Sequence, residues 1–121
     1  MSRRRPEQQL QKAVLEHLAW RGMSGLFVCH YPGGGWRSPV EAAIFKSLGV
    51  VAGTPDLLIV YGGHCFALEL KTAYGRLSQT QVDTQARLRA AGATVATAVE
   101  IDAALEQLEQ WGLLRPIRRS S

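Results

Sequence analysis

The chain has 121 residues, of which 46% are hydrophobic and 20% are charged, a balance that indicates one globular domain and excludes a disordered chain. No apolar run approaches the roughly 20 residues of a membrane helix, and no apolar stretch follows the first arginines as in a signal peptide, so we expect a cytoplasmic protein without a membrane partner. The net charge is +4, and basic tails at about 1–5 and 115–121 suit a polyanion such as nucleic acid.

Hydrophobic spacing and turn residues predict a single domain over 1–121, built from helices and strands. In the first helix, Leu10, Val14 and Leu18 recur at the spacing of one helical face. The expected elements are a helix at 6–21, a strand at 26–31, a short helix at 39–47, strands at 56–61 and 64–71, a helix at 79–91, a strand at 94–99 and a helix at 102–111. This order predicts an α/β fold of the α+β type.

Two of the strand-like runs meet at residues 62–63, a Gly-Gly dipeptide that is typical of a two-residue hairpin turn. Such a turn places Tyr61 opposite His64 and, further along the ladder, Asp56 opposite Glu69. Directly opposed side chains in an antiparallel pair have Cβ atoms about 4.5–5.5 Å apart. Two carboxylates at that separation repel each other, and a divalent cation between them removes the repulsion. Hard oxygen ligands favour Mg²⁺ or Mn²⁺.

Lys71 lies two residues after Glu69, so both side chains are expected on the same face of the strand, whereas Leu70 points to the other face. Two carboxylates and one ammonium on one patch can bind a metal, activate a water and stabilise charge on a phosphate. Two alternatives remain open. Lys71 can form a plain salt bridge with Glu69 while Asp56 only ends a turn after Pro55, and a register slip of one residue would turn Asp56 to the opposite face.

Two Cys-His pairs provide a second candidate metal site. Cys29 precedes His30, and His64 precedes Cys65, so the ligand types of a zinc site are present. The spacing lacks a Cys-x-x-Cys or His-x-x-x-His form. Ordinary thiols in a reducing compartment are therefore the favoured interpretation.

Three motifs follow one another along the chain. They are Gly49-Val-Val-Ala-Gly-Thr-Pro-Asp56, then Glu69-Leu-Lys71, then Gly75-Arg-Leu-Ser-Gln-Thr-Gln81. In this order they resemble the virus-type replication-repair nuclease domain, VRR-NUC, of the PD-(D/E)xK nuclease superfamily, and the resemblance covers about 7–99. It implies a mixed sheet flanked by helices and a metal-dependent cleavage of DNA phosphodiesters, in a bacterial or phage-infected cell.

The resemblance also implies roles for individual residues. Asp56 and Glu69 would bind Mg²⁺ or Mn²⁺ with help from the backbone carbonyl of Leu70. Lys71 would orient or activate the attacking water, and Gln81 would support the site from the start of its helix. Gln81 is also the fourth residue of a Ser-x-x-Gln capping box, so closing the helix start is its alternative role.

The resembled family has an acidic residue on its first helix, for which Glu7 and Glu16 are the candidates here. At about 100° per residue they lie on opposite faces of the helix. Glu7 shares the stripe of the apolar residues, so we expect it to face the core and to reach the site. There it would take part in catalysis and bind the metal, through a water if not directly. Its alternative role is that of a first-turn acid favoured by the helix dipole.

Five further residues are candidate DNA contacts. Trp36 and Arg37 can stack on or grip DNA, or anchor the loop on which they lie. His30, Lys46 and Arg76 can contact phosphates, although a hydrogen-bonded structural role is favoured for His30, and a charged helix residue such as Lys46 is more often only solvated.

We therefore expect a metal-dependent DNA endonuclease that is structure-selective in the manner of a Holliday junction resolvase. Resolvases act as symmetric homodimers, which would place two sites across branched or junction DNA, and the helices at 40–47 and 102–111 are the candidate interfaces. One alternative is a sequence-preferring nicking or restriction-type nuclease, for which no base-reading element is identified. The other is a non-catalytic nucleic-acid-binding module, which the intact Asp56, Glu69 and Lys71 disfavour.

Overall fold

The computed structural model describes residues 4–32 and 38–117. Its elements, in chain order, are α1 (Arg4–Arg21), β1 (Phe27–His30), α2 (Pro39–Ser47), β2 (Leu57–Tyr61), β3 (His64–Lys71), α3 (Gln79–Ala90), β4 (Thr94–Val99) and α4 (Glu100–Gln110). The predicted order of helices and strands is confirmed. None of the helices in the described ranges combines the length and the hydropathy of a membrane span.

Two element boundaries differ from the prediction in ways that matter for the site. Asp56 was expected inside a strand, but β2 begins one residue later, so Asp56 lies on the loop that enters the strand. The last helix was expected from residue 102, but α4 begins at Glu100. It begins directly after β4 because Glu100 adopts a left-handed backbone, with φ of 67°, which turns the chain without a separate loop.

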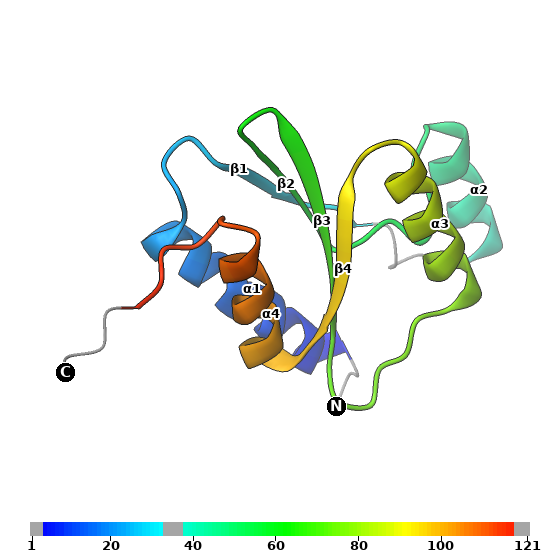
Figure 1. Ribbon diagram of the computed structural model, residues 1–121. Coiled ribbons are helices and arrows are strands. Elements are labelled where there is room, and N and C mark those ends of the chain that lie inside the picture. The colour runs from blue at the N-terminus through cyan, green and yellow to red at the C-terminus, as the bar shows by residue number, and fades with distance from the viewer. Residues whose placement is uncertain (1–3, 33–37, 118–121) are drawn as a thin grey trace.

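The four strands form one mixed sheet in the order β1-β2-β3-β4. The first two pairs are antiparallel and β3 pairs with β4 in parallel, since α3 provides the crossover that a parallel pair needs. Figure 1 shows α1 and α4 on one face of the sheet and α3 on the other, with α2 lying beyond α3. The fold is therefore an α+β domain with helices on both sides of a mixed sheet, as predicted.

The core lies between the sheet and the α1–α4 layer. Leu57 and Ile59 of β2 and Leu68 of β3 have no exposed surface, because alternate residues of each strand point to this layer. They pack against the predicted apolar stripe of α1 and against Ala104 and Leu108 of α4. Full burial of one such side chain contributes about 1.5–3 kcal/mol, so this cluster anchors the hairpin that carries the polar residues of the opposite face.

The structure describes part of each expected basic tail. The N-terminal part joins α1, which begins at Arg4. At the other end, the backbone N–H of Arg115 donates to the carbonyl of Arg21 over 2.8 Å, and the Arg21 guanidinium donates to the carbonyl of Arg115 over 2.6 Å. Arg115, where the expected basic tail begins, is thus tied to the end of α1.

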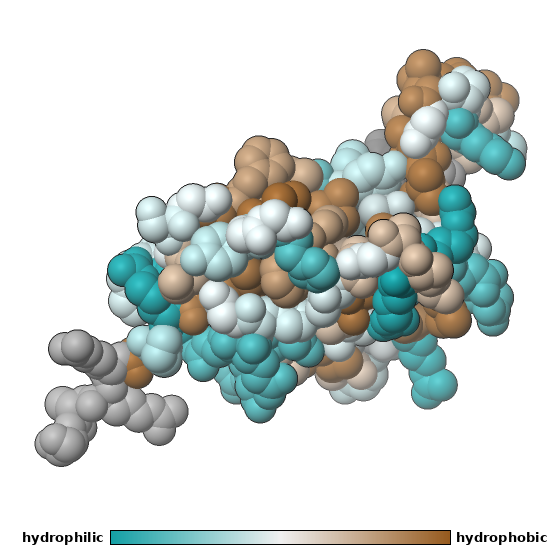
Figure 2. All heavy atoms as spheres, turned by 45° about the horizontal axis from the view of Figure 1, so that its top comes forward, coloured by the Kyte–Doolittle hydropathy of each residue, from teal (hydrophilic) through white to brown (hydrophobic). Residues whose placement is uncertain are grey.

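The helix α2 has an unusual environment. None of its residues is buried, and its backbone does not come close to any other helix or strand of the described chain. Val40, Ile44 and Leu48 repeat every fourth residue and are 70%, 53% and 73% exposed. Figure 2 shows this region as a largely hydrophobic lobe that projects from the body of the molecule.

Candidate active site

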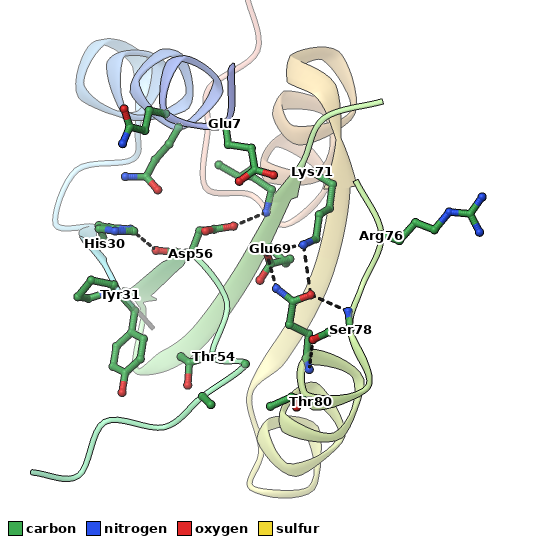
Figure 3. Close-up of a pocket in the computed structure, with 17 residues that line it drawn as sticks. Glu7, His30, Tyr31, Thr54, Asp56, Glu69, Lys71, Arg76, Ser78 and Thr80 are labelled. Carbon is green, nitrogen blue, oxygen red and sulfur yellow. Dashed lines mark hydrogen bonds and ion pairs between the residues drawn. The ribbon is translucent and has the colours of Figure 1, made fainter. Parts of the chain in front are cut away.

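The predicted hairpin register is confirmed. Tyr61 pairs with His64 and Leu57 with Leu68, so the position of Asp56, one residue before β2, continues the ladder opposite Glu69. One carboxylate oxygen of Asp56, Oδ2, accepts the backbone N–H of Leu70 over 2.7 Å. This hydrogen bond fixes the Asp56 side chain against β3 although the residue itself is outside the strand (Figure 3). The local Gly-Gly turn therefore brings the two predicted carboxylates together.

Glu69 is only 3% exposed, which is rare for a carboxylate. The Gln81 side chain, from the first turn of α3, reaches it and donates from Nε2 to Oε2 over 3.4 Å. The ammonium Nζ of Lys71 lies 3.6 Å from Oε2 of Glu69, and the Lys71 side chain is only 12% exposed. The predicted clustering of Asp56, Glu69 and Lys71 on one patch is thus present in the structure, and the Glu69–Lys71 ion pair, offered above as an alternative, is part of the same patch.

Gln81 joins the start of α3 to this patch. Its Oε1 accepts the backbone N–H of Ser78 over 2.9 Å, and Oγ of Ser78 accepts the backbone N–H of Gln81 over 3.1 Å, which completes the predicted capping box. The same Oε1 also accepts from Nζ of Lys71 over 3.2 Å, and Nε2 donates to Glu69 over 3.4 Å. The two roles weighed for Gln81 are therefore combined in one side chain.

The electrostatics of the patch are dominated by the burial of Glu69. Burial, followed by the charge of Asp56 and a hydrogen bond with it, raises the pKa of Glu69 to about 8, while Lys71 acts in the opposite direction. A carboxyl group with this pKa holds its proton at neutral pH unless a further positive charge replaces it. Such strongly perturbed carboxyls are concentrated at functional sites.

The patch forms the floor of an open cavity of about 830 Å³. The start of α1 and the end of β1 form its other walls, and all lining residues are Glu7, Gln8, Gln11, His30, Tyr31, Pro32, Ala52, Gly53, Thr54, Asp56, Glu69, Leu70, Lys71, Arg76, Ser78, Thr80 and Gln81. The predicted catalytic residues therefore share one cavity.

The two acidic residues of α1, Glu7 and Glu16, lie in different places, as predicted, but Glu7 does not face the core. Glu7 is exposed and lines the cavity. Figure 3 shows that its side chain points from α1 toward Lys71 and Asp56. It lies one turn before Leu10, the first buried residue of α1, so it projects past the core into the cavity. Glu16 is exposed as well and is not among the lining residues.

The oxygen donors at the floor of the cavity are of the type that binds a hard divalent cation. Among the described residues, no group of three or more His, Cys, Asp and Glu side chains is arranged to hold one, so the zinc alternative built on Cys29, His30, His64 and Cys65 is not supported, and both cysteines are free thiols. What the cavity offers is the pair Asp56 and Glu69 beside the Leu70 backbone, which are hard oxygen donors. Such a small carboxylate set fits Mg²⁺ or Mn²⁺, which complete their coordination with waters and substrate oxygens.

The candidate DNA contacts lie in different places. Nδ1 of His30 is 3.0 Å from the carbonyl oxygen of Asp56, the structural role favoured above. Arg76 lines the cavity, and its side chain extends away from the floor into solvent (Figure 3). Lys46 is exposed on α2 and does not line the cavity. Trp36 and Arg37 lie outside the described residues.

Sequence reasoning missed the residues that position the loop before Asp56. The hydroxyl of Tyr31 accepts the N–H of Val51 over 2.7 Å, and the hydroxyl of Thr84 on α3 donates to the carbonyl of Ala52 over 2.7 Å. The next residue, Gly53, has φ of +80°, and a Cβ there would lie 2.5 Å from the Thr80 carbonyl oxygen. The loop is thus held on both sides, and Gly53 within the glycine-rich motif was the available signal.

Comparisons with known proteins agree with this geometry. No family model and no curated protein matches the chain. A solved structure described as "VRR_NUC domain protein" matches with a TM-score of 0.71 and 26% identity, over 87% of this chain and 86% of that one. Another, described as "VRR_NUC domain", matches with a TM-score of 0.59 and 20% identity, over 87% of this chain and 96% of that one.

The fold and the buried carboxylate–lysine patch define a nuclease-type α+β domain. The chain shares the fold of these VRR_NUC domain structures, in agreement with the family that the three sequence motifs resemble.

Proposed function

We propose that this protein is a metal-dependent deoxyribonuclease that hydrolyses internal phosphodiester bonds of DNA. The observation that carries the proposal is the burial of Glu69 beside Asp56, with Lys71 Nζ 3.6 Å away, at the floor of an open cavity in a VRR_NUC fold. A purely structural salt bridge needs neither the second carboxylate nor the access from solvent.

Asp56 and Glu69 would hold Mg²⁺ or Mn²⁺, with the Leu70 carbonyl as a third ligand and Glu7 acting through a water from the cavity wall. The cation, when bound, supplies an activated water and offsets charge on the phosphate. A bound cation would also account for the burial of Glu69, whose pKa is about 8, because a divalent charge favours the ionised forms of both Asp56 and Glu69.

The chain's own residues would prepare the reaction as follows. The Leu70 amide holds Asp56 in place, so little reorganisation is needed at the moment of attack. Lys71 orients the attacking water and offsets the charge that develops on the phosphate oxygens. Gln81 holds Lys71 and Glu69 at a fixed separation through its two contacts, and therefore acts as a positioning residue.

We further propose that the enzyme acts on branched or junction DNA as a homodimer, with α2 as the contact surface. The alternative interface, α4, already packs against the sheet and α1, and its Ala104 and Leu108 are buried. In contrast, the row Val40, Ile44 and Leu48 of α2 is uncharged and exposed, and a helix this short is marginal in water by itself. A second copy would cover this row with the same row across a two-fold axis.

The test is cleavage of a labelled four-way junction, a flap and a matched duplex in Mg²⁺, Mn²⁺ and EDTA. We expect cutting that EDTA abolishes and that Asp56→Ala and Lys71→Ala each reduce at least about 100-fold. Paired symmetric incisions on the junction support the resolvase type, whereas cutting of duplex alone, with a sequence preference, supports the nicking or restriction type. Folded protein that binds DNA but cuts nothing in either metal would overturn the enzyme in favour of a binding module.

A further inference from the structure

The loop that joins β3 to α3 carries a tyrosine that the proposed chemistry does not use. Tyr74 is 97% exposed, the largest exposed fraction among the large hydrophobic and aromatic side chains of the described chain. It lies three residues after Lys71 and two before Arg76. Because consecutive Cα atoms are 3.8 Å apart, Tyr74 stays within about 11 Å of Lys71. The backbone of Tyr74 therefore lies close to a residue that lines the cavity, and its ring is exposed to solvent.

The backbone on both sides of Tyr74 is held in place. The N–H of Gly75 donates to the carbonyl of Thr72 over 2.9 Å and closes a turn. The N–H of Ala73 donates to Oε1 of Glu100 over 2.6 Å. Tyr74 lies between these two hydrogen bonds, so its position is defined by the turn rather than by contacts of its own ring.

Glu100, which holds this turn, has a strained backbone. Its φ of 67° makes it the one non-glycine residue with a left-handed backbone in the described part of the chain, and such a residue is commonly strained. The turn also lies against the catalytic lysine, because a Cβ at Gly75 would be 3.1 Å from Cδ of Lys71. The strained residue Glu100 therefore fixes the segment that carries Lys71, Tyr74 and Arg76.

A single exposed aromatic residue is normal on a protein surface. This one is distinguished by its fixed turn and by its neighbour, since the exposed Arg76 also lines the cavity. An aromatic face beside a guanidinium is the combination that binds single-stranded nucleic acid, in which the ring stacks on a base and the cation contacts the backbone. Bases inside a continuous duplex are already stacked and cannot offer a face to the ring.

We propose that Tyr74 stacks on an unpaired base of the DNA strand that Arg76 leads into the cavity. The pair Tyr74 and Arg76 thereby selects substrates with an unpaired or frayed nucleotide next to the scissile phosphate, such as branch points, over continuous duplex. This inference rests on the proposed function, since it assigns a substrate class to the same cavity.

The test is binding of the full-length protein, in EDTA so that no DNA is cut, to DNA with 2-aminopurine at the unpaired position of a branch and to a matched duplex. Stacking on Tyr74 quenches this fluorescent base. We expect Tyr74→Ala to weaken binding to branched DNA about tenfold and to abolish the quenching, while duplex binding stays unchanged. Tyr74→Phe keeps the ring and should keep both signals.

The matched control is Trp20→Ala, which removes another exposed aromatic residue about 20 Å along α1 from Glu7 and should leave both substrates unaffected. Equal loss of branched and duplex binding in Tyr74→Ala, or retained quenching, overturns the inference. The outcome is independent of catalysis. If the wild-type protein quenches the fluorescent base through Tyr74 but never cuts in Mg²⁺ or Mn²⁺, the stacking contact is supported and the nuclease function is refuted. If it cuts DNA but Tyr74→Ala changes neither binding nor quenching, the nuclease function is supported and the stacking contact is refuted.

Discussion

Single residues at the floor of the cavity combine roles that are usually separate. Gln81 closes the start of α3 and at the same time contacts Lys71 and Glu69. The Leu70 amide belongs to a strand and also holds Asp56. Because structural and chemical roles share the same atoms, variants at these positions must be measured for stability and for activity.

At Glu69 we predict that the free energy of unfolding depends on pH and that a bound divalent metal offsets the loss at high pH. The pKa of Glu69 is raised from 4.5 to about 8, so between these values the folded state binds a proton that the unfolded state has released. The free energy of unfolding should therefore fall as pH rises from about 4.5 to 8. Mg²⁺ or Mn²⁺ replaces that proton and should raise Tm more at pH 8 than at pH 6.

Calorimetric unfolding of wild type and Glu69→Gln across this pH range, with and without metal, checks this. The variant cannot ionise at this position, so the part of the pH dependence due to Glu69 and most of the metal response should disappear. If the variant still gained as much Tm from metal as wild type does, Glu69 would not be a ligand.

At Gln81 we predict a loss of activity that exceeds the loss of stability. Gln81→Ala removes its contacts with the patch and one half of the capping box, which costs about 1 kcal/mol. We expect cleavage to fall at least about tenfold under conditions where the variant remains folded. Gln79→Ala is the control, because the side chain of Gln79 donates to Asp83 in the same helix and, within the described residues, does not line the cavity. Equal activity in the two variants would leave Gln81 as a cap alone.

Two loops position side chains of the site in addition to the strands and helices. The segment from α2 to β2 passes between Tyr31 and α3 before it reaches Asp56. The segment from β3 to α3 is held by Glu100, the first residue of α4. The strand β3 supplies Glu69 and Lys71, the helices supply Glu7 and Gln81, and the two loops supply Asp56 and Arg76.

At the element scale, Gly53→Ala tests the first of these clamps. The substitution meets the Thr80 carbonyl and demands a left-handed backbone, which together should cost several kcal/mol, and it should displace Asp56. Gly62→Ala also has a positive φ but meets no atom within 4 Å, so it should cost only about 1–2 kcal/mol. Urea unfolding compares the two variants, and equal losses would show that the contact with Thr80 is unimportant.

The exposed apolar row of α2 lies outside the lining of the cavity. The row Val40, Ile44 and Leu48 projects on α2, while the cavity is lined mainly by polar and charged residues. The two surfaces suit different partners, namely a second copy of the chain and a phosphate backbone.

For the whole molecule we predict a dimer that one charge on α2 dissociates. Ile44→Glu would place two carboxylates in an apolar interface, where an unpaired charge is costly, so sedimentation velocity at micromolar concentration should show a monomer. Gln110→Glu adds the same charge to an exposed position of α4 and should leave a dimer. A wild-type monomer, or dissociation only by the α4 variant, would refute the α2 interface.

The order of the elements and the hairpin register were predictable from the sequence. Periodicity and turn residues depend on neighbours along the chain, and the Gly-Gly turn is local, so Tyr61 opposite His64 followed from it directly. The ends of the helices and strands were less predictable. The strand β2 begins after Asp56 because pairing with β3 begins there, and α4 begins at Glu100 because tertiary contacts support its strained backbone.

The sequence by itself thus determined the order of the elements, through periodicity and turn residues. It also determined that Asp56 lies opposite Glu69 and that Glu69 and Lys71 share a face, because both features depend on spacing within a few residues of one turn. Only the tertiary structure decided that Glu69 is buried, that Glu7 projects into the cavity instead of the core, and that α2 turns its apolar row outward. These features depend on which helix covers which face of the sheet. That is decided by the packing of segments far apart in the chain, and it leaves no periodic trace in the sequence.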